Sequence, residues 1–173
     1  KGETSQVRDF IAQQAPHGDA GTLWLAASLG RMISAMSHLW EGHPVRAEAA
    51  LLPALAHAER EGRRALIACL LASVLATACY QRGDAAQAQS LLANRLDVIE
   101  RGGFPDNVLF AYRTLAFCAM EEGDERRALA LLQQMEALAI RRGWPRLRAV
   151  SLSEQIRLHA AHARRETVAR LLD

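Results

Sequence analysis

The residues of this chain that are able to carry chemistry are few and widely spaced. His159 and His162 lie three positions apart, a spacing that lets two imidazoles on one helix face share a metal ion, but no Cys, Asp or Glu stands at a suitable spacing beside them. His38 and Cys79 occupy equivalent positions before two successive turns, so their side chains could meet as a Cys–His nucleophilic pair. A polar helix face and a packed interior explain these pairs better. We therefore predict no enzyme activity, no metal site and no cofactor.

The charged residues and glycines lack the order that binding of phosphates or nucleic acids requires. Gly102-Gly103 follows a helical pattern, whereas a phosphate-binding loop precedes its helix. The formal net charge is only +2, which argues against a polybasic surface for nucleic acid or membranes. Charged residues interrupt every apolar run before it reaches about 20 residues. We expect no direct nucleic-acid binding and no membrane association.

The cysteines indicate a reducing compartment. Cys69, Cys79 and Cys118 lie inside apolar helical patterns, and an odd number without close pairing does not make a disulfide framework. Small buried thiols are the expected state. Since 50% of the residues are hydrophobic, the chain has ample material for a sizeable core. A cytoplasmic location follows as the expectation.

The elements that must position these residues are repeated. Gly123-Asp124 begins the run Gly-Asp-Glu-Arg-Arg-Ala-Leu-Ala-Leu-Leu, and Gly83-Asp84 begins a similar run 40 residues upstream. In each run Gly closes one helix in the left-handed conformation, and Asp caps the next helix. The template also matches at Gly2, Gly42 and Ala163. These five turns are 40, 41, 40 and 40 residues apart, which is typical of a repeat protein.

We predict a single all-α domain over residues 1–173, an α-α superhelix of antiparallel helix pairs. The expected parts are the second helix of a preceding repeat at 3–15, full repeats at 22–62, 63–103 and 104–143, and a truncated repeat at 144–173. Terminal glycines Gly62, Gly103 and Gly143 close the full repeats, and the second helix of the middle repeat should run continuously over 84–101. Pro53 is expected to bend the helix over 44–61. Because the chain starts and ends within repeats, we expect a piece of a longer polypeptide.

Residues at fixed distances from the turns identify the type of repeat. Small residues stand seven before the turn and five after it, and a large apolar residue stands nine after it: Ala35, Ala76, Ala116; Ala47, Ala88, Ala128; Leu51, Leu92, Leu132. These positions match the tetratricopeptide pattern. The aromatic position early in the first helix is kept only at Tyr112, and each unit is several residues longer than that pattern.

The lengthened units resemble the repeat region of MalT-type regulators, in which Gly-Asp turns join helices rich in Ala, Leu and Arg. The units here end in Arg-Gly-Gly-Phe-Pro or Arg-Arg-Gly-Trp-Pro. MalT-type proteins are bacterial LuxR-class transcription activators with an ATPase module, a helical-repeat domain and a helix-turn-helix. The resemblance implies a sensor and interaction domain, inducer binding and ATP-dependent self-association of the whole regulator. The alternative is a stand-alone tetratricopeptide-like adaptor that binds peptides.

In tetratricopeptide-like solenoids the first helix of each pair lines a concave groove. The corresponding positions are the candidate binding residues: Met32, Met36, Leu39, Trp40, Ser73, Thr77, Tyr80, Gln81, Phe110, Arg113, Phe117, Met120, Glu121, Ser153 and Arg157. An apolar trough with a few charged anchors suits a partner helix or a small ligand with one charged end. The competing interpretation is packing between helices, which we favour for Trp24 and Trp144. The apolar ends of the stack would also permit homo-oligomers.

Overall fold

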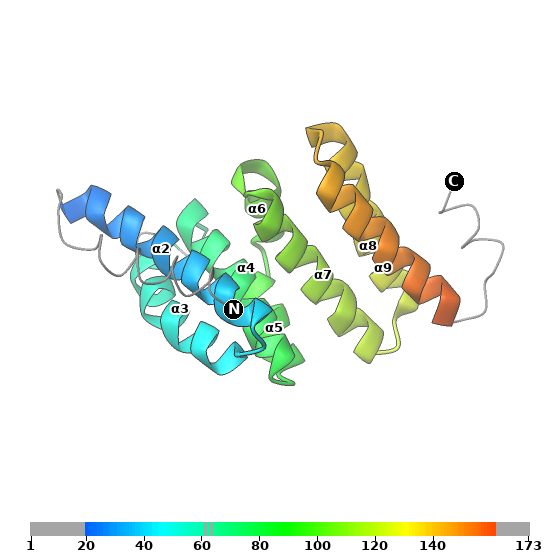
Figure 1. Ribbon diagram of the computed structural model, residues 1–173, viewed down its shortest axis with the longest axis horizontal. Coiled ribbons are helices and arrows are strands. Elements are labelled where there is room, and N and C mark those ends of the chain that lie inside the picture. Colours follow the sequence, from blue (N-terminus) through cyan, green and yellow to red (C-terminus); the bar gives the residue numbers. More distant parts are fainter. Residues whose placement is uncertain (1–19, 61, 63, 162–173) are drawn as a thin grey trace.

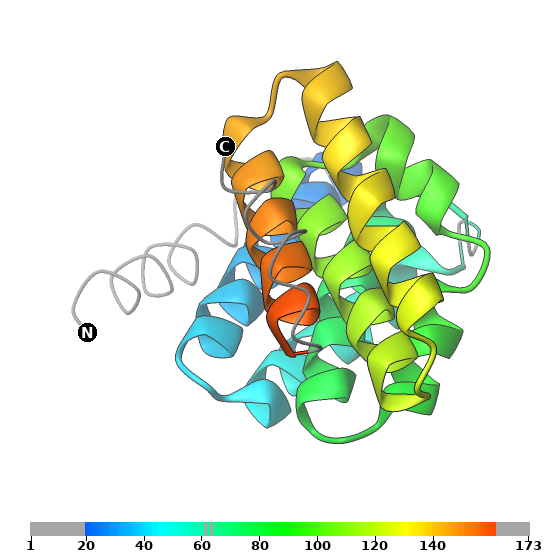
Figure 2. The same ribbon diagram turned by 90° about the vertical axis from the view of Figure 1, so that its right-hand side faces the viewer.

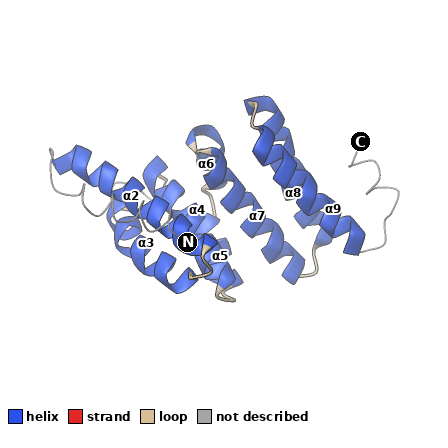
Figure 3. Ribbon diagram, in the orientation of Figure 1, coloured by secondary structure: helices blue, strands red, loops and turns tan. Residues whose placement is uncertain are grey.

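The computed structural model describes residues 20–60, 62 and 64–161, and within them the chain is all-α, as predicted (Figure 3). Eight helices and no strand are present among these residues. The helices are α2 (Ala20–Trp40), α3 (Pro44–Ala58), α4 (Leu66–Gln81), α5 (Ala85–Leu92), α6 (Leu96–Gly102), α7 (Pro105–Glu121), α8 (Glu125–Arg142) and α9 (Pro145–Ala161). The predicted helices at 3–15 and 165–172 lie outside the described residues.

The helices form hairpins that stack in chain order. Helix α2 packs on α3, α4 on α5 and α7 on α8, while α3 packs on α4 and α8 on α9. Figure 1 shows this order from α2 and α3 at the left to α8 and α9 at the right, and Figure 2 views the stack from the α8–α9 end. The repeat architecture is therefore confirmed. Among helices α2 to α9, no helix is both long enough and apolar enough to cross a membrane.

The hairpin turns follow from two residues. Gly42, Gly83 and Gly123 have φ angles of 77°, 86° and 76°, a region that residues with a side chain rarely adopt. After the last two of these turns, the side chains of Asp84 and Asp124 each accept a hydrogen bond at 2.9 Å from the backbone N–H three residues on. Each pair ends one helix and starts the next within three residues. Both predicted roles are confirmed.

The second helix of the middle repeat is broken, so the predicted continuous helix over 84–101 is wrong. Helix α5 ends at Leu92 and α6 begins at Leu96, because Asn94 between them takes the left-handed conformation with φ 58°. Asn tolerates this conformation better than most residues. The break turns the Arg95 side chain inward, where it is 1% exposed and pairs with Glu59. Helix α3, by contrast, continues through Pro53.

Gly103 ends α6 in a different way from Gly143 at the end of α8, since Gly143 is left-handed with φ 65° and Gly103 is extended with φ −76°. Gly62 has a positive φ of 134°, but α3 already ends at Ala58, so the predicted helix over 44–61 is shorter than expected. A Cβ atom at Gly103 would lie 2.4 Å from the backbone oxygen of Ile99, which is too close for any side chain. Close packing of the backbone, and not a left-handed turn, therefore requires glycine at this position.

The first helices of successive hairpins also contact one another directly. On α7, the buried side chain of Asn107 donates hydrogen bonds to the Leu70 carbonyl at 3.1 Å and to Ser73 Oγ at 3.0 Å, both on α4. The same amide nitrogen lies 3.4 Å from the sulfur of Met32 on α2. One side chain thus joins three helices that are far apart in sequence. This contact places α2, α4 and α7 side by side beneath the groove described next.

Candidate functional site

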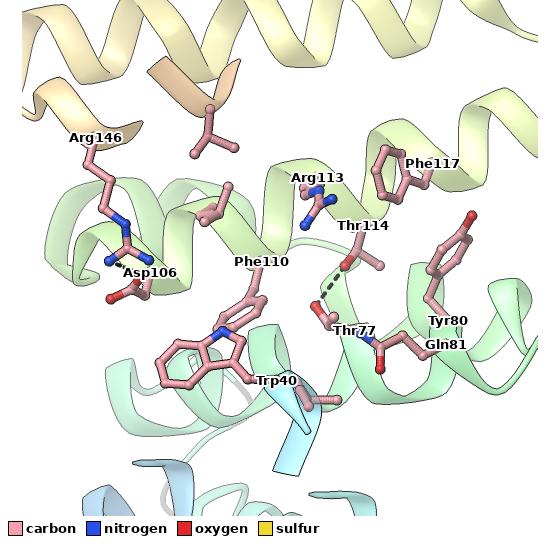
Figure 4. A pocket seen from close by; sticks show the side chains of 13 residues that line it. Trp40, Thr77, Tyr80, Gln81, Asp106, Phe110, Arg113, Thr114, Phe117 and Arg146 are labelled. Atoms are coloured by element: carbon pink, nitrogen blue, oxygen red, sulfur yellow. Dashed lines mark hydrogen bonds and ion pairs between the residues drawn. The ribbon is translucent and has the colours of Figure 1, made fainter. Parts of the chain in front are cut away.

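A cavity of about 350 Å³ opens along α2, α4, α7 and α9, the first helices of the hairpins (Figure 4). Its lining residues are Leu39, Trp40, Thr77, Tyr80, Gln81, Asp106, Leu109, Phe110, Arg113, Thr114, Phe117, Arg146 and Val150. The largest share, six of the thirteen, comes from α7. We call this cavity the groove.

Eight of the residues predicted for the groove from repeat positions line it: Leu39, Trp40, Thr77, Tyr80, Gln81, Phe110, Arg113 and Phe117. Each lies on the expected first helix, toward the end of α2 and α4 and along the middle of α7. The structure therefore brings together the aromatic residues and the central arginine of the sequence prediction.

Three predicted groove residues lie elsewhere, inside the helix layer. Met32 is 5% exposed, Met36 8% and Ser73 0%, and none of the three lines the groove. The physical reason is the direct contact between α2, α4 and α7, in which Asn107 covers Met32 and Ser73. The competing interpretation, packing between helices, is correct for these positions.

The remaining predicted residues lie near the groove without lining it. Met120 is half-buried against the core, and Ser153 and Glu121 are exposed. Arg157 is exposed as well and faces Glu154 on the same helix at 3.4 Å. The groove therefore ends short of the last turn of α7 and the middle of α9.

Aromatic side chains line the groove at two places. Trp40 and Phe110 lie together at one place, and Tyr80 and Phe117 lie at the other, with ring centroids 5.8 Å apart (Figure 4). Trp40 is 61% exposed, so a large indole surface is open to a ligand. Burial and the neighbouring Glu121 carboxylate raise the pKa of Tyr80 to about 12, so its phenol is neutral at physiological pH. These surfaces suit a flat apolar group.

A cation lies between the aromatic groups. The Nε atom of Arg113 is 2.8 Å from Oε1 of Glu154, whose side chain is only 8% exposed, and the guanidinium carbon is 5.0 Å from the ring centroid of Phe117. Glu154 also faces Arg157, so one buried carboxylate serves two guanidinium groups. These three side chains carry one net positive charge. The groove therefore offers an anion-binding position beside an aromatic surface.

Two further polar pairs were missed by the sequence analysis. Asp106 and Arg146 form an ion pair at 3.3 Å between α7 and α9, and the hydroxyls of Thr77 and Thr114 are 2.8 Å apart between α4 and α7 (Figure 4). The sequence does contain a signal for the pair of Asp106 and Arg146. Asp106 and Arg146 each follow the proline that begins its helix, so opposite charges occupy equivalent positions in neighbouring repeats.

Cys79 and His159, the described residues considered above for nucleophilic or metal chemistry together with His38, do not line the groove. Burial raises the pKa of Cys79 to about 11, which keeps this thiol protonated and weakly nucleophilic at neutral pH. His159 is buried, and His162 lies outside the described residues. In the described part of the chain, no three His, Cys, Asp or Glu side chains are grouped to hold a metal.

The two tryptophans expected to pack between repeats do not line the groove, but their ring contacts lie within one hairpin or one turn. Trp24 contacts His57 with ring centroids 5.0 Å apart, and Trp144 lies under the guanidinium of Arg142 at 5.7 Å. Both are half-buried against the core.

Comparison of the chain with protein-family models, with curated proteins and with solved structures finds no match. The functional interpretation therefore rests on the groove and on the repeat pattern.

Proposed function

We propose that the chain is a non-enzymatic recognition domain that binds a small-molecule inducer in the groove, as the sensor domain of a MalT-like, LuxR-class transcription regulator would. The observation that carries this proposal is the cavity of about 350 Å³ beside aromatic side chains and a central arginine. Its volume lies within the range of roughly 300–1,000 Å³ for small-molecule sites. In the whole cytoplasmic regulator, an occupied groove would shift the equilibrium between resting and assembled states.

The polar groups of the groove suit holding a ligand. Thr77 and Thr114 are bonded to each other, Asp106 is paired with Arg146, and the Tyr80 phenol is neutral. A few polar groups of this kind in a mainly apolar site orient a bound molecule. Another domain of the same polypeptide, or a peptide bound by a stand-alone adaptor, would have to enter the same groove. The volume, which is near the lower limit for ligand sites, favours a small molecule.

Fluorescence of Trp40 tests the binding site. In a Trp24→Phe/Trp144→Phe background, Trp40 is the remaining tryptophan of the chain and lines the groove. We expect members of a set of small acids, bases and neutral compounds to change its emission saturably. Phe117→Ala should abolish the change. Phe104→Ala is the matched control, because Phe104 is an exposed aromatic outside the groove.

Two results would contradict the binding proposal: no saturable change with any compound, or equal loss of binding in Phe104→Ala. The regulatory context has a separate test. A transcription regulator of this kind should carry a nucleotide-binding loop upstream and a helix-turn-helix downstream in the same polypeptide. A reading frame that contains neither would favour the adaptor.

A further inference from the structure

Arg113 lies between two phenylalanines on one face of α7. Phe110, Arg113 and Phe117 are spaced three and four residues apart, so their side chains follow one another along the helix toward the groove (Figure 4). The Arg113 side chain is 42% exposed. A ligand that contacts the aromatic rings on either side must therefore pass this guanidinium.

The guanidinium of Arg113 keeps capacity for a second anion. Its ion pair with Glu154 is made through Nε, which comes within 2.8 Å of the carboxylate without the geometry of a hydrogen bond. In the part of the chain that the structure describes, the two terminal nitrogens of Arg113 make no hydrogen bond. Arg157 also pairs with the Glu154 carboxylate, which weakens the ion pair between Glu154 and Arg113. A planar guanidinium binds a carboxylate through two parallel N–H donors. The free donors of Arg113 thus match a ligand carboxylate.

The charge of the groove favours an anion as well. Of the residues that line the groove, Arg113 and Arg146 are positively charged and Asp106 is negatively charged, which leaves one positive charge. The neutral phenol of Tyr80 adds no repulsion. Glu121, the acidic neighbour of Tyr80, does not line the groove. A ligand with a single negative charge would balance the site.

We propose that the inducer is a small aromatic carboxylate. Its carboxylate binds the terminal nitrogens of Arg113, and its ring lies against the aromatic surface of Trp40 and Phe110 or of Tyr80 and Phe117. The inference rests on the proposed function of the groove and adds the chemical class of the ligand. A neutral aromatic of the same shape would keep the ring contacts and lose the charge-assisted hydrogen bonds.

Calorimetric titration with 2-naphthylacetate and with its amide, 2-naphthylacetamide, separates charge from shape. We expect the acid to bind the chain about tenfold more tightly or better, since hydrogen bonds to charged groups contribute roughly this factor. Arg113→Met should lower the affinity for the acid to that for the amide. Arg113→Lys should retain part of the preference for the acid. Arg127→Met is the charge-matched control, because Arg127 pairs with Glu122 outside the groove and its loss should leave the preference intact.

Each other outcome overturns the inference. Equal binding of acid and amide, with both abolished by Phe117→Ala, would leave the groove as a binding site and reject the carboxylate. If the folded Arg113→Met and Arg113→Lys variants still bind the acid more tightly than the amide to the full extent, Arg113 is not the residue that binds the carboxylate. If neither probe binds, the inference fails, and the Trp40 titration with the wider compound set decides whether the proposed function fails with it.

Discussion

The two sides of α7 are held in different ways. Toward α4, its contacts are neutral and largely buried, with the amide of Asn107 and the hydroxyls of Thr77 and Thr114 bonded between the helices. Toward α9, two ion pairs bridge the groove, Asp106 with Arg146 and Arg113 with Glu154. Arg146 is 73% exposed and Arg113 42%. The hydrogen bonds of Asn107 are thus shielded from water and that between Thr77 and Thr114 is part-buried, whereas the ion pairs toward α9 are more open to water.

This difference gives the groove one fixed side and one adjustable side. Buried neutral hydrogen bonds are costly to break, because an unpaired polar group then remains inside the protein. Ion pairs near the surface contribute about 1 kcal/mol or less and weaken with salt. A ligand anion that competes for Arg113 would therefore loosen α9 more readily than α4. The predictions below test this contrast, beginning with the largest effect.

Alkaline pH should weaken the α4 side. Burial raises the pKa of Cys79 on α4 and of Cys118 on α7 to about 11, from an ordinary value of 9.0. The stabilisation by the neutral thiols is complete below pH 9 and is lost as the pH rises to 11. We expect the free energy of unfolding to fall by about 2 kcal/mol per thiol over this range in urea titrations.

The double variant Cys79→Ala/Cys118→Ala should show a clearly smaller fall over the same range of pH. Carboxylates and guanidinium groups do not change charge between pH 8 and 11, so the α9 contact supplies no such dependence. An unchanged pH profile in the double variant would show that the buried thiols are not responsible.

Removal of the amide on the α4 side should cost nearly as much. Asn107→Ala removes two buried hydrogen bonds to α4 and opens a void, while Ser73 Oγ still donates to the Leu70 carbonyl at 2.7 Å. We expect a loss of about 2 kcal/mol in the free energy of unfolding. Gln133→Ala, a loss of an exposed amide on α8, should change it by less than about 0.5 kcal/mol. Similar values for the two variants would contradict the assignment of the α4 contact as the fixed one.

Salt should distinguish the two contacts directly. A double-mutant cycle of Arg113→Met and Glu154→Gln should give a coupling of about 0.5–1 kcal/mol at low ionic strength, which disappears in 1 M salt. The cycle of Thr77→Val and Thr114→Val should give a coupling that salt does not change. If the coupling energy between Arg113 and Glu154 does not change with salt, the α7–α9 contact is not the adjustable one.

The smallest effect is expected outside both contacts, at the break between α5 and α6. Asn94 has φ 58°, so Asn94→Gly should change the free energy of unfolding by only a few tenths of a kcal/mol, whereas Asn94→Ala should cost about 1 kcal/mol. Thermal denaturation of the two variants measures the difference. A loss from Asn94→Gly as large as that from Asn94→Ala would mean that the side chain, and not the backbone conformation, holds the break.

Local signals predicted the hairpins well. Gly83 and Asp84 are neighbours in sequence, and their roles in ending one helix and capping the next depend on the adjacent backbone alone. The break at Asn94 is accompanied by a contact between Arg95 and Glu59, which are 36 residues apart. No local pattern contains that information, and the apolar spacing of 84–101 is compatible with one continuous helix.

Groove residues were predictable where the helix faces open space and unpredictable where another helix covers it. Repeat positions place Tyr80 and Met32 on the same face of their helices, yet Tyr80 lines the groove and Met32 is buried. The difference comes from Asn107, whose amide reaches Met32 from a helix two hairpins along the chain. The exposure of a repeat position is thus a property of the stack, which single repeats do not encode.

The buried Arg95 has a consequence for how the chain unfolds. It lies in the second hairpin and pairs with Glu59 at the end of the first, so loss of Glu59 would leave the buried guanidinium without this partner. In repeat proteins, the strength of coupling between neighbours sets how many units unfold together. The first two hairpins should therefore unfold as one cooperative block, and their amide protons should exchange with a common free energy. At this end of the chain the thermodynamic unit is twice the length of the structural repeat.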